Sequence, residues 1–220
     1  MTAFVAGATG LTGRLVVAEL RRRGVPTYAH VRPDSARMDA WRAQFSELGA
    51  EVDPTPWTPE AMGARLSALQ PEVVFALLGT TRKRANAGGG DYEAVDWGLT
   101  ILLLEAAAQA GSPRFVYLGA AGTGPRVRGA YMQVRWRVEE RLRAGPLPWT
   151  SVRASFITGE RDEERPMEHV GAGASDAALG LVKLLGGRAI RDRYRSITAR
   201  QLAFALVRVG LDPEFSGQVV

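Results

Sequence analysis

The chain has 220 residues, of which 46% are hydrophobic and 23% are charged, so it is long and apolar enough to bury a sizeable core. It has no cysteine, which excludes disulfides, a thiolate nucleophile and cysteine metal sites. Its two histidines, His30 and His169, argue against a histidine metal centre and a Ser-His-Asp relay. The net charge of +5 comes from arginines scattered among acids, so we expect no nucleic acid partner.

The sequence shows no sign of a membrane segment. No apolar run approaches the roughly 18 residues that a spanning helix needs. The first strand pattern already begins at residue 3, so we expect no signal peptide. Together with the lack of cysteine, these features favour a cytoplasmic protein without a membrane partner.

Strand and helix patterns alternate along the chain. Apolar runs predict strands at 3–6, 27–31, 50–53, 72–78, 114–118 and 150–153. Helical patterns predict helices from 15 to near Gly24 and at 34–48, 59–69, 91–110, 130–144, 175–185 and 198–209. This alternation indicates an α/β, doubly wound parallel sheet. We expect one domain, 1–220, in which 155–220 contribute a small C-terminal lobe on the substrate side.

Several predicted helix ends carry their own signals. Thr58 is a candidate N-cap with Pro59 at the first helical position. Gly49 is expected to follow the second helix, and Gly145 the helix at 130–144. Gly210 is expected to close the last helix.

The segment between the first strand and the first helix reads Gly7-Ala8-Thr9-Gly10-Leu11-Thr12-Gly13. In such a setting the first glycine allows a sharp turn, the second lets the backbone approach a phosphate, and the third allows close helix–strand packing. The helix N-terminus then offers unpaired N–H groups to a pyrophosphate. The pattern predicts a dinucleotide site in a Rossmann sheet of strand order 3-2-1-4-5-6; the alternative is a tight turn without a ligand. The candidate cofactor-binding residues here are Gly7, Thr9, Gly10, Leu11, Thr12 and Gly13.

The end of the second strand distinguishes NADP(H) from NAD(H). An acidic residue there would bind a ribose 2′-OH, but this chain has Arg32, whose guanidinium suits a 2′-phosphate. Ser35 could add a hydroxyl. We therefore expect NADP(H) to be preferred over NAD(H). Two alternatives stay open: Arg32 is simply an exposed loop residue, or Asp34 contacts the ribose and restores NAD binding.

With these features and a later Tyr131-Met132-Gln133-Val134-Arg135 segment, the chain resembles the short-chain dehydrogenase/reductase superfamily. It is most similar to the atypical short branch that includes the Tat-interacting-protein-like oxidoreductases. The other markers of the resemblance are Leu78-Gly79-Thr80-Thr81-Arg82, Val138-Glu139 and Val152-Arg153. The resemblance implies that the cofactor lies across Leu78, Gly79 and Thr80, and that Asp53 and Pro54 line the adenine site.

Active members of that superfamily carry a Tyr-x-x-x-Lys pair and a serine after the fifth strand. The resemblance makes Tyr131 the candidate proton donor or acceptor, and Arg135 stands at the lysine position as a candidate catalytic and ribose-binding residue. No serine follows the fifth strand, although Thr123 could take its place. Lys83 could reach the nicotinamide end of the site or lie in a solvated loop. Tyr131 could alternatively pack on the loop before its helix.

Other side chains near these positions have simpler interpretations. Glu139 and Arg143 continue the face of the Tyr131 helix and are expected to be surface charges. Trp136, Trp149 and Phe156 are expected to line the core or a pocket, because they do not alternate with a basic stripe.

The sequence therefore supports three functions of different kinds. The first is an NADP(H)-dependent oxidoreductase of a small carbonyl, quinone or flavin-type substrate, with a degraded Ser-Tyr-Lys set. The second is a non-catalytic NADP(H)-sensing protein that acts through a protein partner. The third is an epimerase or dehydratase of nucleotide sugars. We expect a monomer or a homodimer that acts on a small molecule, and the sequence does not decide whether it is an enzyme.

Overall fold

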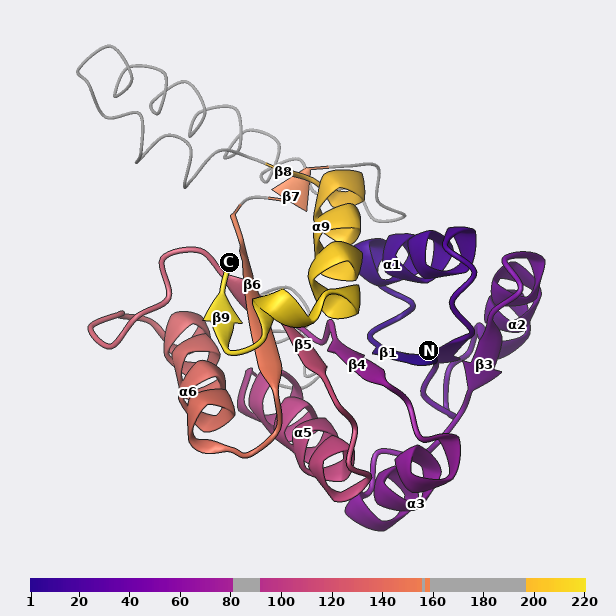
Figure 1. The fold of residues 1–220 in the computed structure, drawn as a ribbon, viewed down its shortest axis with the longest axis horizontal. Coiled ribbons are helices and arrows are strands. Elements are labelled where there is room, and N and C mark those ends of the chain that lie inside the picture. Colours follow the sequence, from indigo (N-terminus) through magenta and orange to yellow (C-terminus); the bar gives the residue numbers. More distant parts are fainter. Residues whose placement is uncertain (81–91, 156, 159–196) are drawn as a thin grey trace.

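The computed structural model describes residues 1–80, 92–155, 157–158 and 197–220. Strands and helices alternate over most of this part of the chain (Figure 1). The strands are β1 (Ala3–Ala6), β2 (Thr27–His30), β3 (Glu51–Asp53), β4 (Val73–Ala76), β5 (Phe115–Ala120), β6 (Trp149–Ala154), β7 (Ile157–Thr158), β8 (Ile197–Thr198) and β9 (Gln218–Val219). The helices are α1 (Leu11–Arg22), α2 (Met38–Glu47), α3 (Pro59–Leu69), η1 (Tyr92–Leu99), α5 (Thr100–Gln109), α6 (Ala130–Ala144), α9 (Ala199–Leu211) and η2 (Pro213–Phe215).

Seven parallel strands form one sheet in the order β3-β2-β1-β4-β5-β6-β9. This confirms the predicted doubly wound parallel sheet with strand order 3-2-1-4-5-6. The structure adds β9 at the edge, parallel to β6, with Gln218 opposite Thr150. A separate pair, β7 and β8, is also parallel.

The sheet separates two cores. Along β1, Ala3 and Val5 point into one core while Phe4 and Ala6 point into the other, as the period of a strand requires. Helices α1, α2 and α9 cover the first face, and α3, α5 and α6 cover the second. All four residues of β1 and of β4 are buried, which explains their continuous apolar runs.

Most predicted helix ends are confirmed. The Thr58 side chain accepts a hydrogen bond from the Ala61 N–H, and Pro59 is the first residue of α3. Gly49 follows α2 with a left-handed φ of 72°, and α6 ends at Ala144 before Gly145. The second helix begins at Met38 rather than residue 34, because a turn at Arg32–Ser35 precedes it.

Two predicted elements have a different form. The helix expected at 91–110 is divided: η1 is a π-helix over Tyr92–Leu99, and α5 follows at Thr100. The last helix runs to Leu211, so Gly210 does not close it. Gly210 lies inside α9 because a Cβ there would be 2.6 Å from the Phe75 ring, and only glycine allows the helix so close to the sheet.

The end of the chain belongs to the sheet and its helix layer. Helix α9 packs beside α1 on one face, and β9 extends the sheet (Figure 1). Of the lobe expected at 155–220, residues 159–196 lie outside the described residues, as does the helix predicted at 175–185. None of the helices in the described ranges is both long and apolar enough to cross a bilayer.

Replacing Gly210 with valine should destabilise the fold by about 1–3 kcal/mol, because the new side chain must displace Phe75 or Val116. Urea unfolding followed by circular dichroism measures this change. Ala205→Val in the same helix, at a half-buried position, is the control for the β-branched side chain itself. Equal stabilities of the two variants would contradict the close packing of α9 on β4.

Candidate nucleotide-binding site

The glycine turn connects β1 to α1 and lies against the end of β4. Gly7 has a φ of 81°, a backbone conformation that favours glycine. A Cβ on Gly7 would lie 2.5 Å from the carbonyl oxygen of Leu77, and a Cβ on Gly13 would overlap the carbonyl oxygen of Gly7. Gly7 and Gly13 thus allow the turn, the strand and the helix to pack closely, as expected for the first and third glycines of such a motif.

The N-terminus of α1 presents main-chain N–H groups without a capping side chain. Gly10 is the N-cap, no side chain accepts from the first turn, and no acidic residue lies in that turn. The bonds of the helix begin with the Arg14 N–H, which donates to the Gly10 carbonyl at 3.0 Å. Thr9, half-buried, precedes the cap. The N–H groups before Arg14 are free of helix bonds and suit an anion; they belong to Leu11, Thr12 and Gly13.

The loop after β2 carries the predicted 2′-phosphate residues. The Arg32 side chain is 55% exposed, and its Nε lies 3.5 Å from a carboxylate oxygen of Asp34, which is 74% exposed. An ion pair this exposed contributes little to the stability of the fold and leaves the guanidinium accessible. Ser35 is half-buried, and its hydroxyl oxygen accepts a 3.4 Å bond from the Arg37 N–H.

Two further arginines lie near this loop. The guanidinium carbons of Arg37 and Arg14 lie 4.6 Å and 6.0 Å from the centre of the Trp41 ring in α2. Sequence reasoning named Arg32 alone. The spacing of Arg37 and Trp41, one helical turn apart, is a signal that could have found part of this group.

The carboxylate of Asp53 is not available as an adenine ligand. It is fully buried, lies 2.5 Å from the Arg65 Nε, and accepts a 3.0 Å hydrogen bond from the Thr55 N–H. Its carboxylate therefore holds the β3–α3 loop, and the lining of the adenine site by Asp53 and Pro54 stays a prediction. Pro54 is exposed and is the member of the predicted pair that a ligand can reach. The imidazole of His30 is also buried and lies 2.7 Å from the Thr55 carbonyl oxygen, and burial lowers its pKa.

The segment after β4 is held by side chains from two other elements. The Leu78 carbonyl accepts a 3.2 Å hydrogen bond from Arg135, and the Thr80 N–H donates to Asp96 at 2.8 Å. Gly79 lies exposed between them, and a Cβ on it would be 2.8 Å from an Arg135 nitrogen. The three residues predicted to lie under the cofactor thus sit beside the glycine turn, since Leu77 touches Gly7.

Arg135 faces the protein rather than an open site. Its guanidinium donates to the Tyr117 hydroxyl at 3.0 Å, to the Leu118 carbonyl at 2.9 Å and to Asp96 at 2.6 Å, besides Leu78. Only 6% of its side chain is exposed, and its partner Asp96 is fully buried. These contacts direct the guanidinium toward the protein, and the catalytic and ribose-binding role of Arg135 stays a prediction. Asp96, which completes this ion pair, was missed because it lies 39 residues away in sequence.

Burial decides the direction of the pKa shifts of Tyr117 and Asp96, whereas the neighbouring groups decide that of Arg135. Burial raises the pKa of Tyr117 to about 12, although Arg135 opposes the shift. Burial also raises the pKa of Asp96, against the lowering effects of Arg135 and the Thr80 N–H. Burial alone would lower the pKa of Arg135, but Tyr117, Tyr131 and Asp96 outweigh it and raise it. Tyr117 and Arg135 therefore keep their protons throughout the neutral range.

Tyr131 lies at the start of α6, half-buried. Its ring is edge-on to that of Tyr92 in η1, with the ring centres 5.3 Å apart, and the Arg135 guanidinium carbon lies 5.1 Å from its centre. The four-residue spacing therefore places Tyr131 and Arg135 on one helix face, as the sequence implied.

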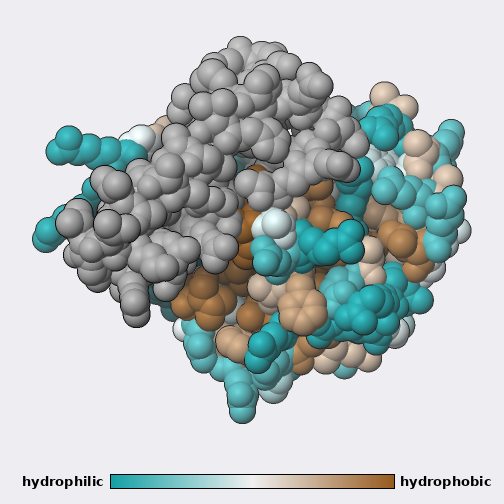
Figure 2. All heavy atoms as spheres, turned by 90° about the horizontal axis from the view of Figure 1, so that it is seen from above, coloured by the Kyte–Doolittle hydropathy of each residue, from teal (hydrophilic) through white to brown (hydrophobic). Residues whose placement is uncertain are grey.

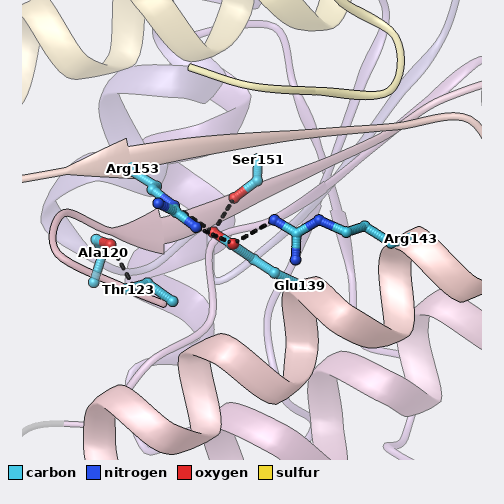
Figure 3. A network of polar contacts seen from close by, with 6 residues as sticks. All are labelled: Ala120, Thr123, Glu139, Arg143, Ser151 and Arg153. Atoms are coloured by element: carbon cyan, nitrogen blue, oxygen red, sulfur yellow. Dashed lines mark hydrogen bonds and ion pairs between the residues drawn. The ribbon is translucent and has the colours of Figure 1, made fainter. Parts of the chain in front are cut away.

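Thr123 does not present a free hydroxyl at the end of β5. It is buried, and its hydroxyl donates to the Ala120 carbonyl at 2.5 Å. This contact holds the turn after β5 (Figure 3). The hydroxyl considered as a replacement for the missing serine is thus bonded to the main chain.

Glu139 lies at the centre of a second buried network, which corrects its assignment as a surface charge. Its carboxylate is fully buried, accepts two hydrogen bonds from Arg153, at 2.8 and 2.5 Å, and one from the Ser151 hydroxyl at 2.9 Å. Arg143, 36% exposed, approaches from the next turn at 3.0 Å (Figure 3). Gly119 makes room for the group, since a Cβ there would lie 2.9 Å from the Ser151 hydroxyl oxygen.

Some expected residues cannot be placed. Lys83 and Phe156 lie outside the described residues, as do Thr81 and Arg82 of the marker segment. Trp149 packs against the core beneath α3, α5 and α6, as expected. Seen from above the view of Figure 1, the described residues present both hydrophobic and hydrophilic side chains on this face of the molecule (Figure 2).

Residues 7–178 match the model of a family described as NAD(P)H-binding. The chain belongs to this NAD(P)H-binding family. The match begins at Gly7, the first glycine of the turn, and includes Tyr131 and Arg135. With the strand order, it confirms the resemblance to the atypical short-chain dehydrogenases/reductases, and it supports a nicotinamide cofactor without distinguishing NADP from NAD.

Curated relatives cover most of the chain. "Protein fmp52-1, mitochondrial" of Aspergillus oryzae is 31% identical over 168 residues, which are 74% of this chain and 68% of the relative. "Protein fmp-52, mitochondrial" of Neurospora crassa is 30% identical over 198 residues, or 86% and 76% of the two chains. The predicted cytoplasmic localisation is contradicted by these relatives, which are named as mitochondrial proteins; nothing in composition or cysteine count could have distinguished the two compartments.

Solved structures share the fold at low identity. A putative NAD-dependent epimerase/dehydratase from Bacillus halodurans has a TM-score of 0.72 and 18% identity, covering 100% of this chain and 92% of that one. The oxidoreductase ylbE from Lactococcus lactis has a TM-score of 0.67 and 18% identity, with 100% and 89% covered. These similarities show the fold that this NAD(P)H-binding protein shares with them.

Replacing Glu139 with glutamine should lower the free energy of unfolding at pH 7 by about 3–5 kcal/mol, because Arg153 then lacks its buried counter-charge. Burial opposes ionisation, but Arg153 and Ser151 hold the pKa of Glu139 below its usual 4.5. The stability due to this carboxylate is therefore complete above about pH 4.5 and is lost as the pH falls below it.

Urea unfolding between pH 3 and pH 7 checks both parts of this expectation. Wild type should lose stability on acidification more steeply than Glu139→Gln. The control is Glu140→Gln, an exposed position on the same helix, which should leave stability unchanged. A Glu139→Gln protein as stable as wild type would contradict the network.

Proposed function

We propose that this NAD(P)H-binding family member is an NADP(H)-dependent oxidoreductase that reduces a small carbonyl, quinone or flavin-type substrate. The observation that carries the proposal is the uncapped N-terminus of α1 behind the glycine turn. Its N–H groups, the absence of an acid in its first turn and the space left by Gly7 and Gly13 fit a dinucleotide pyrophosphate.

The preference for NADP(H) rests on the loop after β2. Arg32 is exposed, it forms an ion pair with the exposed Asp34, and Ser35 lies in the same loop. Within this proposal, Arg32 and Ser35 bind the 2′-phosphate, and Leu78, Gly79 and Thr80 lie beneath the nicotinamide half.

The proposed reaction depends only weakly on acid–base catalysis by the protein. The bound cofactor supplies a hydride, and Tyr131 is the candidate proton donor at the substrate oxygen. Arg135 is paired with Asp96, and the Thr123 hydroxyl is bonded to the Ala120 carbonyl, so neither supports Tyr131 in the usual way. A quinone or flavin acceptor suits such a site, because its reduction needs no strong proton donor.

Replacing Arg32 with alanine should weaken NADPH binding about tenfold or more and leave NADH binding unchanged, since only NADPH carries the 2′-phosphate. Isothermal titration of both cofactors measures the two affinities. Arg42→Ala is the matched control, because Arg42 is 59% exposed in α2 and pairs only with the exposed Asp39 among the described contacts. Equal losses for both cofactors would contradict the 2′-phosphate assignment.

Replacing Tyr131 with phenylalanine should lower turnover of a carbonyl substrate about 100-fold or more while NADPH affinity stays the same, because only the hydroxyl is lost. NADPH oxidation across a panel of carbonyls, quinones and flavins measures turnover. Tyr92→Phe, which removes the hydroxyl of the adjacent ring, is the control. A wild-type protein that binds NADPH but does not oxidise it in the presence of any acceptor of the panel would instead support the non-catalytic sensing function.

A further inference from the structure

Arg135 stands where active relatives carry lysine, and its contacts give it a different task. We propose that Arg135 and Asp96 form a positioning clamp that fixes residues 78–80 in the shape that receives the cofactor. This inference rests on the proposed NADP(H) binding, because it assigns residues 78–80 to the cofactor-facing surface. Arg135 is thus a positioning residue and not a catalytic one.

The clamp holds the main chain of residues 78–80 at both ends. The Nη2 of Arg135 donates to the Leu78 carbonyl at 3.2 Å, and the Oδ2 of Asp96 accepts from the Thr80 N–H at 2.8 Å. The same Nη2 lies 2.6 Å from the other oxygen of Asp96, which joins the two contacts. A single ion pair thereby fixes one acceptor and one donor on either side of Gly79.

The other arm of the guanidinium anchors the clamp to the neighbouring strand. Nη1 donates to the Leu118 carbonyl at 2.9 Å and to the Tyr117 hydroxyl at 3.0 Å, both in β5. The pair is removed from water, with 6% of the Arg135 side chain exposed and none of Asp96. Separating a buried charge from its partner costs much free energy, so the ends of β4 and β5 keep a fixed position relative to α6 and η1.

Lysine could not make the same set of contacts. Its ammonium is one point with three donors, whereas the planar guanidinium spreads its N–H groups over separate nitrogens. Here two of those nitrogens reach four acceptors on three elements. Gly79 is matched to this fork, since a Cβ on it would lie 2.8 Å from Nη2. The arginine, Asp96 and Gly79 therefore act as one unit.

The first test needs no cofactor and no substrate. In Arg135→Lys, the Thr80 N–H should exchange with deuterium at least about tenfold faster than in wild type, because Asp96 loses its anchor. The control is Glu139→Gln, which breaks the other buried ion pair of α6 but leaves residues 78–80 untouched. Unchanged exchange in Arg135→Lys, or equal acceleration in both variants, would overturn the clamp.

The second test measures NADPH affinity by fluorescence titration. Arg135→Lys should weaken NADPH about tenfold, whereas Glu139→Gln should not change its affinity. Gly79→Ala should weaken NADPH in the wild-type background and cost less when Arg135 is already lysine, because the clash with Nη2 is gone. Strictly additive effects, or NADPH affinity unchanged in Arg135→Lys, would overturn the inference.

The two proposals fail in different ways. A wild-type protein that does not bind NADPH would remove the proposed function, whereas the deuterium exchange of the Thr80 N–H would still report on the clamp. Should Arg135→Lys not fold, the Gly79→Ala variant gives the decisive result by itself: tight NADPH binding with an alanine at 79 would overturn the clamp, and weakened binding would support it.

Discussion

The site depends on a close approach between the glycine turn and the end of β4. Gly7 lies so near the Leu77 carbonyl that any side chain would separate the two segments. That approach brings the glycine turn and the N–H groups at the start of α1 close to residues 78–80, which we propose to face the cofactor. Neither segment would form a cofactor-facing surface alone, because each supplies only main-chain groups.

Helix α6 is held against the sheet and η1 by two buried charged side chains, Arg135 and Glu139, one turn apart. Arg135 is directed toward β4, β5 and η1, while Glu139 is directed toward β6. Buried charges of this kind are tolerated only with partners, and Asp96 and Arg153 provide them. The helix that carries Tyr131 is therefore attached to the sheet at fixed positions, which fixes the place of that tyrosine in the fold.

Much of the fold followed from local signals. The continuous apolar run of β4, the Thr58-Pro59 start of α3 and Gly145 after α6 each have one dominant local cause, and the structure agrees with them. Strand β9 could not be predicted, because two exposed residues have no pattern of their own and their pairing with β6 is purely tertiary. The prediction that Gly210 closes the last helix was wrong for a similar reason. The glycine is needed because the Phe75 ring leaves no room for a side chain at this position, and it does not mark the end of a helix.

The sequence by itself determined the parallel α/β sheet and the nucleotide turn, because glycine spacing and apolar periodicity act over a few residues. Only the tertiary structure decided which charged groups remain available. The sequence suggested that Asp53 is a ligand, Arg135 a catalytic residue and Glu139 a surface charge. In the structure each is buried against a charged partner: Asp53 against a residue 12 positions away, Arg135 against one 39 positions away, and Glu139 against one 14 positions away. Desolvation makes such partners obligatory, and no local pattern reveals where the folded chain brings them from.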